Sequence, residues 1–290
     1  MSNYDLFTDS GCDFPNSIPS DISIIPIKVT FGDEDLPPDS ALGYFFHRLA
    51  TEKATTAAPS DYEIAECLRP SLQAGRDVLY VTMTTTLSST YEHSQTAAIN
   101  LRQEFPNRRV ECIDSRCVSG GQALMITELL RLREYGATID RLIKFIDDNW
   151  RKVMHIFTVD NLDCLYRGGR VSRTKYRVAS TLNVVPLMHL DSNCELSAIK
   201  NVRFKKACKE SAKIVDGTIA ANSSTVWLHH GNCPDQAEEY RDALEKHDLN
   251  VIYGDKVRIG GVIASHTGGT VKAKFYWGND RNDALDPKHQ

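Results

Sequence analysis

Residues 78–90 have the sequence VLYVTMTTTLSST, which joins a compact apolar run of strand length to a hydroxyl-rich loop. A stretch of helical length, Ser89 to Phe105, follows directly. A strand that passes through a short loop into a helix is the repeating unit of α/β proteins with parallel sheets. This stretch therefore predicts an α/β fold with the loop at the carboxyl end of a strand, where such folds place their ligand sites.

The same alternation continues on both sides of this stretch and restarts after residue 151. We predict two α/β domains, residues 1–151 and 152–290, with central, largely parallel or mixed sheets flanked by helices. The crevice between two domains of similar length is the expected place for a ligand. Other predicted segments include strands over residues 4–8, 22–31, 109–114, 153–159 and 261–265, a turn over 32–39, and helices over 119–135, 204–220 and 236–247.

Charge and composition exclude several classes of partner. The 290 residues carry a formal charge of -4, which provides no basic footprint for nucleic acid or an anionic lipid surface. Asp5 stands where a signal peptide requires a basic region, and no apolar stretch approaches the roughly 20 residues of a membrane span. The eight cysteines include no C-x-x-C pair and suit a reducing compartment. We expect a cytoplasmic protein without a nucleic-acid partner or a transmembrane segment.

The segment Thr8-Asp9-Ser10-Gly11-Cys12-Asp13 follows the first predicted strand, at a position typical of ligand-binding loops. Asp9 could bind a cation or act as a base. The alternative is structural, because Asp9, Ser10 and Asp13 are all residues that cap and stabilise turns. The structural interpretation is favoured for this loop.

Two hydroxyl-rich loops predict an anion site. Residues 84–90 place six hydroxyl side chains beside the unsatisfied N–H groups of a helix start, and residues 55–60 also end at a helix start. Their scale suits a carboxylate or a phosphate, and the loops lack the glycines and lysine of a P-loop. The alternative is that Ser88 or Ser89 simply caps the helix.

Two glycine-containing segments are further candidates. Residues 165–173 place Arg170 and two other arginines around Gly168-Gly169, so this loop could meet an anion or an acidic partner, or be a solvated surface. Residues 260–269 enclose His266 between two Gly-Gly pairs, where the backbone can approach a ligand closely and the imidazole can donate a hydrogen bond.

Motifs for other chemistry are missing from the sequence. It contains no G-x-S-x-G, H-E-x-x-H, G-x-G-x-x-G or Walker pattern. His229 and His230 are adjacent on a predicted strand and would point to opposite faces, so they do not predict a metal site. We therefore expect neither a metal nor an organic cofactor.

Taken together, these segments resemble the DegV family in their order and approximate spacing, over nearly the whole chain. The resemblance implies a two-domain α/β protein that binds one long-chain fatty acid, with the acyl chain buried and the carboxylate held by hydroxyl groups. The motifs that carry it are Thr8-Asp9-Ser10 with Asp13, Thr56 with Pro59-Ser60, Leu87-Ser88-Ser89-Thr90-Tyr91, Gly168-Gly169-Arg170-Val171-Ser172, and Gly261-Val262-Ile263 leading to His266-Thr267-Gly268.

The resemblance also implies a partner. Several family members are the fatty-acid-binding subunits of a bacterial fatty-acid kinase, in which a separate kinase subunit uses ATP to phosphorylate the carboxylate. The acyl phosphate then enters phospholipid synthesis. A protein similar to these members is expected to be a binding subunit without catalytic activity of its own.

The family's carboxylate-binding positions match Thr56, Ser88 and His266 in this sequence. Ser89 and Thr267, beside them, are further predicted ligand-binding residues. Arg170 and Arg173 would contact the phosphate or the kinase subunit.

The sequence departs from the family pattern at three places: Ala57 where a second hydroxyl residue is usual, Ser89 where a glycine is usual, and Thr267-Gly268-Gly269 where Gly-Pro-Gly or a similar run is usual. These departures concern chain-length preference and the individual hydrogen bonds more than the class of ligand. The alternative hypothesis is a small-molecule hydrolase or acyltransferase with Ser88 as nucleophile, His266 as base and Asp9 as the orienting acid.

Overall fold

The computed structural model describes residues 4–37, 40–173, 184–203, 206–254, 257–281 and 285. The strands are β1 (Tyr4–Asp9), β2 (Ser23–Ile25), β3 (Lys28–Phe31), β4 (Glu34–Leu36), β5 (Ala54–Ala57), β6 (Asp77–Thr82), β7 (Val110–Asp114), β8 (Val153–Thr158), β9 (Val184–Leu190), β10 (Leu196–Arg203), β11 (Thr225–His230), β12 (Asn250–Ile252) and β13 (Lys272–Trp277). The helices are α1 (Leu42–Leu49), α2 (Asp61–Gln73), α3 (Thr90–Glu104), α4 (Ser119–Glu134), α5 (Ile139–Asn149), the 3₁₀ turn η1 (Trp150–Lys152), α6 (Asp163–Arg167), α8 (Ala207–Thr218), α9 (Pro234–Glu245) and α10 (Gly261–Thr267).

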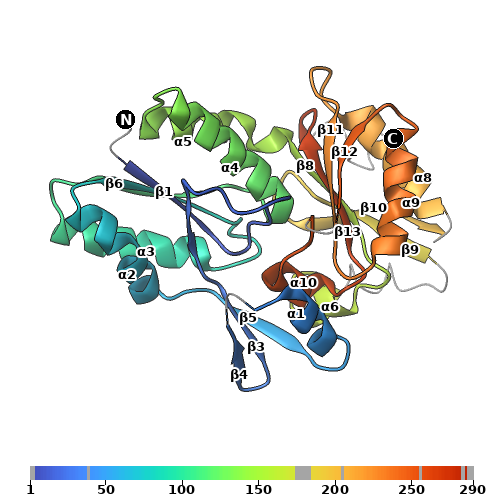
Figure 1. Cartoon of the computed structure of the whole chain (residues 1–290), viewed down its shortest axis with the longest axis horizontal. Helices are drawn as coiled ribbons and strands as arrows, with labels where there is room; N and C mark the ends of the chain where they lie inside the picture. Colours follow the sequence, from blue (N-terminus) through green and yellow to red (C-terminus); the bar gives the residue numbers. More distant parts are fainter. Residues whose placement is uncertain are drawn as a thin grey trace.

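Two sheets organise the molecule in layers (Figure 1). The first has the order β2-β1-β6-β7 with every pair parallel, and α2 and α3 cover one of its faces. The second has the order β10-β9-β8-β13-β11-β12, in which β11 and β12 form the parallel pair and the other neighbours are antiparallel. Helices α8 and α9 cover its outer face. The predicted α/β class with parallel and mixed sheets is confirmed.

The parallel sheet is built from residues before 151 and the mixed sheet from residues after 152. This division is compatible with the two predicted domains, whose boundary stays a prediction. Buried apolar side chains form a continuous core between the two sheets, and smaller clusters lie beneath α2 and α3 and beneath α8 and α9.

A small antiparallel sheet, β4-β3-β5, projects beside α1 below the parallel sheet (Figure 1). The predicted single strand over residues 22–31 is wrong, because the chain leaves the parallel sheet at Pro26, which has no N–H to donate to a ladder. The predicted turn over residues 32–39 is also wrong in part, since Gly32 and Asp33 form a tight turn and β4 follows at once. Gly32 has a φ of 60°, which a glycine adopts without strain.

Helix α4 lies between the two sheets, and its first turn has almost no side chains on the face toward the mixed sheet. A Cβ on Gly120 would lie 2.4 Å from the Phe275 ring, and one on Gly121 would lie 2.0 Å from His155 Nε2. On the side toward the parallel sheet, Gln122 Nε2 donates to Thr8 Oγ1 at 2.9 Å. The two glycines therefore allow the helix to approach the mixed sheet closely while it stays bonded to the parallel one.

The predicted strand over residues 261–265 is a helix, α10. Val262 and Ile263 are β-branched and locally favour a strand. In the fold α10 packs against α1, α6 and β5, and the helix buries Val262 and Ala264 together. Tertiary packing has overridden local propensity at this point.

The first turn of α4 provides a stability test. Gly121→Ala should lower the free energy of unfolding by about 1–3 kcal/mol, because the new methyl group overlaps the buried His155 ring. Gly217→Ala in α8 is the matched control: no atom lies within 4 Å of the added Cβ, and loss of backbone entropy in the unfolded chain should raise stability by about 0.5–1 kcal/mol. Urea unfolding measures both, and equal stability of the two variants would contradict the packing argument.

Candidate functional site

A cavity of about 330 Å³ lies beside the start of α4, between the mixed sheet and the loops that follow β2 and β6 of the parallel sheet. Apolar side chains line most of it, including Phe157 on β8 and Phe275 on β13 of the mixed sheet and Met83 in the loop after β6. The hairpin formed by β9 and β10 adds Leu190 and Leu196. A cavity with such walls can enclose the apolar part of a ligand.

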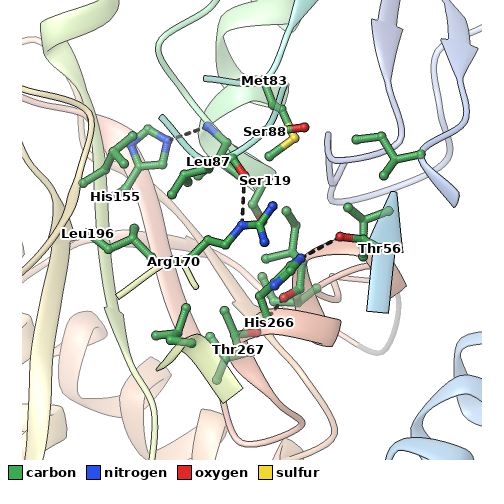
Figure 2. Close-up of a pocket in the computed structure, with 18 of the residues that line it drawn as sticks. Thr56, Met83, Leu87, Ser88, Ser119, His155, Arg170, Leu196, His266 and Thr267 are labelled. Atoms are coloured by element: carbon green, nitrogen blue, oxygen red, sulfur yellow. Dashed lines mark hydrogen bonds between the residues drawn. The ribbon is translucent and has the colours of Figure 1, made fainter. Parts of the chain in front are cut away.

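Polar side chains from three distant segments line the same cavity. Thr56 comes from β5, Ser88 precedes α3, and His266 lies in α10. Thr56 Oγ1 and His266 Nε2 are 2.8 Å apart and form a hydrogen bond. In the view of Figure 2, this pair and His155 lie on opposite sides of the cavity. The structure thus brings together the three residues predicted to hold a carboxylate, and Ser89 and Thr267 line the cavity beside them. Their assignment to a ligand stays a prediction.

The imidazole of His266 is neutral near pH 7. Burial, and then the charge of Arg170, lower the pKa of His266 to about 4. Its Nδ1 is buried without a hydrogen-bond partner among the described residues and lies against Gly168, where a Cβ would be 2.4 Å away. Near the positive charge of Arg170, an unprotonated Nδ1 is favoured over a protonated one. We therefore assign the proton of the neutral imidazole to Nε2. Nε2–H then donates to Thr56 Oγ1, and the Thr56 hydroxyl proton is available to an anion in the cavity.

Ser88 stands at the N-terminus of α3. Its Oγ accepts a hydrogen bond from the Thr90 N–H at 3.3 Å and lies 2.8 Å from Thr90 Oγ1. The N-cap residue itself is Ser89, whose side chain makes no capping bond. Ser88 therefore both binds an N–H of the first helical turn and lines the cavity. Because the start of a helix carries partial positive charge, this part of the cavity suits an anion.

Arg170 is half-buried at the wall of the cavity. Its Nε donates to the Leu87 carbonyl at 3.0 Å and its Nη1 to the Gly168 carbonyl, as Figure 2 shows for Leu87. Burial lowers the pKa of Arg170, whose hydrogen bonds in the described part of the chain go to carbonyl oxygens. Arg170 thus connects the segment after α6 to the loop that carries Ser88. Arg173 is exposed and does not line the cavity.

The loop after β1 lies behind the cavity wall and does not line it. Asp9 is fully buried and accepts bonds from the Met83 N–H at 2.7 Å and the Gly11 N–H at 3.0 Å. Ser10 Oγ accepts from the Ile27 N–H at 2.8 Å. Burial raises the pKa of Asp9 to about 6 and that of Asp13 to about 7. The hydrogen bonds of these side chains go to other parts of the chain, as a structural loop requires.

Two polar side chains of the cavity were not among the candidate site residues of the sequence analysis. Ser119, at the start of α4, lines the cavity with a φ of 56°. His155, on β8, is fully buried with its Nε2 accepting the Val118 N–H at 3.2 Å. The run Ser119-Gly120-Gly121 at a predicted helix start was an available signal, because glycines inside a helix indicate close approach of another chain segment. No local pattern indicates His155.

A serine-hydrolase arrangement is not assembled in the described residues. Ser88 Oγ is bonded to Thr90, and His266 Nε2 to Thr56. Asp9 binds backbone N–H groups and Gln122, whereas His266 Nδ1 has no partner to orient it. The three residues of the hydrolase hypothesis therefore lack the mutual bonds that such a relay needs.

Among the residues that the structure describes, no three His, Cys, Asp or Glu side chains gather as metal ligands. No helix in that part of the chain has both the length and the hydropathy of a membrane span. All eight cysteines are free thiols.

Comparison with known sequences shows the relatives of this chain. A family model described as "Uncharacterised protein, DegV family" matches residues 3–277. A DegV domain-containing protein of Clostridium perfringens is 28% identical over 97% of this chain and 99% of its own length. One of Lactococcus lactis is 24% identical over 92% of this chain and 96% of its own.

Comparison with solved structures shows the same fold. A fatty acid binding DegV family protein from Streptococcus agalactiae superposes with a TM-score of 0.82 at 25% identity, covering 95% of this chain and 98% of that one. A stearic acid-binding protein from Eubacterium ventriosum gives 0.80 at 22% identity, with 94% and 97% covered. The Fatty Acid Kinase B3 protein of Streptococcus pneumoniae, loaded with linoleic acid, gives 0.77 at 18% identity, with 96% and 99% covered.

The low pKa of His266 predicts a pH dependence of stability. The folded protein holds this pKa at about 4, whereas the unfolded chain has the ordinary value of 6.5, so the unfolded chain binds more protons between these two pH values. The stabilising effect of the neutral imidazole is complete above pH 6.5 and is lost as the pH falls toward 4. His266→Gln should therefore lose less stability than the wild type over this interval.

Urea unfolding at several pH values measures this difference. A His266→Gln profile that runs parallel to the wild-type profile over this interval would contradict a buried neutral His266.

Proposed function

The chain belongs to the DegV family, and on this premise we propose that it binds one long-chain fatty acid and presents its carboxylate to a separate fatty-acid kinase. The observation that carries the proposal is the combination of apolar walls and a hydroxyl-lined polar part within one cavity. The acyl chain would lie between the two sheets, at the interface of the domains proposed as residues 1–151 and 152–290. The carboxylate would lie at Thr56, Ser88 and His266.

The acyl chain would supply most of the affinity. Each buried CH₂ group contributes about 0.8 kcal/mol, so a long chain between Met83, Phe157 and Phe275 gains far more than the polar end can. The fatty acids named for the similar structures from Eubacterium ventriosum and Streptococcus pneumoniae, stearic and linoleic acid, support this class of ligand.

The polar end would hold the carboxylate with neutral donors. The Thr56 and Ser88 hydroxyls donate to its oxygens, and Ser89 and Thr267 complete the lining. Neutral hydroxyls withdraw less charge from a carboxylate than a paired lysine would. An oxygen held in this way remains nucleophilic enough to attack the terminal phosphate of ATP.

Phosphoryl transfer needs a partner in this proposal. The chain would act as a binding subunit without catalytic activity, and a cytoplasmic kinase subunit would bring ATP. Arg170 at the cavity wall and Arg173 on the surface would contact the kinase or the new phosphate. The acyl phosphate would then be consumed in phospholipid synthesis. The similarity to the Streptococcus pneumoniae Fatty Acid Kinase B3 protein supports this partner.

The first test concerns the ligand. Protein purified without added lipid should release a long-chain fatty acid into an organic extract at close to one molecule per chain, because burial of the acyl chain in this apolar cavity gives an affinity that persists through purification. Mass spectrometry identifies and counts the released acid. A lipid-free extract, together with no binding of an added long-chain fatty acid, would contradict the proposal.

The second test concerns the carboxylate. Thr56→Val should weaken fatty-acid binding about tenfold, since it removes a hydroxyl that donates to the carboxylate without changing the shape of the side chain. Thr55→Val is the matched control, because Thr55 is the neighbour on β5 and its hydroxyl bonds Thr30 on the exposed face. Titration with a fluorescent fatty acid measures both affinities. Equal affinities of the two variants for the fatty acid would contradict the assignment of Thr56 to the carboxylate site.

A further inference from the structure

Asp13 joins two segments that are far apart in the sequence. Its buried carboxylate lies in the loop after β1 and accepts two hydrogen bonds. The Ser119 hydroxyl, at the start of α4, donates to Oδ2 at 2.5 Å. The Gly260 N–H, at the start of α10, donates to Oδ1 at 3.0 Å. One carboxylate therefore binds the first residue of α4 and the N-cap residue of α10.

The space around this carboxylate is tightly filled. A Cβ on Gly260 would lie 2.5 Å from Asp13 Oδ1, which is closer than nonbonded atoms approach. Ser119 has a left-handed φ of 56°, and its N–H donates to the Gly11 carbonyl at 2.9 Å. Ser119 also lines the cavity. A residue held in a strained conformation by its neighbours is typical of functional sites.

The orientation of α10 decides where His266 lies. Gly260 provides no side-chain cap for this helix, and the Asp13 carboxylate binds its start instead. His266 lies near the other end of α10 and meets Thr56 Oγ1 at 2.8 Å. A hydrogen bond of this length weakens when its donor moves or turns away. A displacement at the start of such a short helix therefore reaches His266 directly.

The neighbouring carboxylate makes a different set of contacts. Asp9 is as deeply buried as Asp13, but its partners are the Met83 and Gly11 N–H groups and Gln122. All three precede residue 151. Asp9 thus stabilises the part of the fold around the parallel sheet, whereas Asp13 connects that part to α10.

We propose that Asp13 is a positioning residue of the carboxylate site, which sets His266 against Thr56 by holding the start of α10 to the start of α4. Its effect on fatty-acid affinity rests on the proposed function, but its effect on His266 does not. The geometry of His266 can be measured in the protein without a ligand, so the two ideas can fail separately.

The experiment compares alanine variants of the two aspartates. In ligand-free wild-type protein with isotope-labelled histidine, His266 Nε2–H should give a protected NMR signal, because it is bonded to Thr56. Asp13→Ala should abolish this signal, move the pKa of His266 back toward 6.5 and weaken fatty-acid binding about tenfold. Asp9→Ala should leave the signal in place even where it lowers stability.

Asp13→Asn tests the hydrogen bonds themselves. Its amide oxygen can accept from Gly260 N–H while its NH₂ group donates to Ser119 Oγ, so the His266 signal should return. If Asp13 contributed only to overall stability, the Asp13→Asn substitution would not specifically restore the His266 signal.

Gly260→Ala and Gly261→Ala form a second pair in case Asp13→Ala does not fold. The added methyl group displaces the Asp13 carboxylate in the first variant, whereas in the second the nearest side chain to it is the Phe45 ring at 3.4 Å. A folded Asp13→Ala or Gly260→Ala protein with an unchanged His266 signal overturns the proposal, as does an equal loss of the signal in Asp9→Ala or Gly261→Ala. Wild-type protein that binds no fatty acid contradicts the proposed function, and the His266 signal still decides the role of Asp13.

Discussion

Gly120 and Gly121 leave the first turn of α4 bare on one face, and the rings of Phe275 and His155 occupy the space where their side chains would stand. Because the same helix is bonded through Gln122 to β1, this contact sets the separation of the two sheets. Phe157 and Phe275 of the mixed sheet and Ser119 at the start of α4 line the cavity, so its width depends on the same contact. The enclosed apolar space beside the start of α4 therefore depends on the close approach of α4 to the mixed sheet.

The polar part of the cavity is assembled by contacts between segments that have no local reason to meet. Thr56 and His266 are separated by 210 residues and share one hydrogen bond. Arg170 holds the loop of Ser88 through the Leu87 carbonyl, and its charge contributes to keeping His266 neutral. The result is a set of neutral donors beside one half-buried cation, an arrangement that suits an anion.

Much of the fold follows from patterns in the sequence, and the errors have physical causes. The apolar runs of β1, β6 and β8 were predicted because buried strands of α/β proteins are continuously apolar. The division of residues 22–31 was missed because β-branched residues continue past Pro26 into a second sheet. Helix α10 was predicted as a strand because Val262 and Ile263 favour one locally, whereas its packing against α1 and β5 requires a helix. His155 was missed because the residues beside it in the sequence form an ordinary strand pattern, which does not indicate that a histidine within it lines a cavity.

The sequence by itself determined the class of fold, the apolar strands and the hydroxyl-rich segments that end at helix starts, since these depend on residue type and short-range spacing. It also placed Thr56, Ser88 and His266 among the candidates through their motifs. Only the tertiary structure decided that these residues line one cavity, that Thr56 bonds His266, and that Arg173 lies outside it. The same holds for Asp13, whose bonds to Ser119 and Gly260 cross 106 and 247 residues. Such contacts depend on how the sheets and α4 pack in space, and no spacing along the chain encodes them.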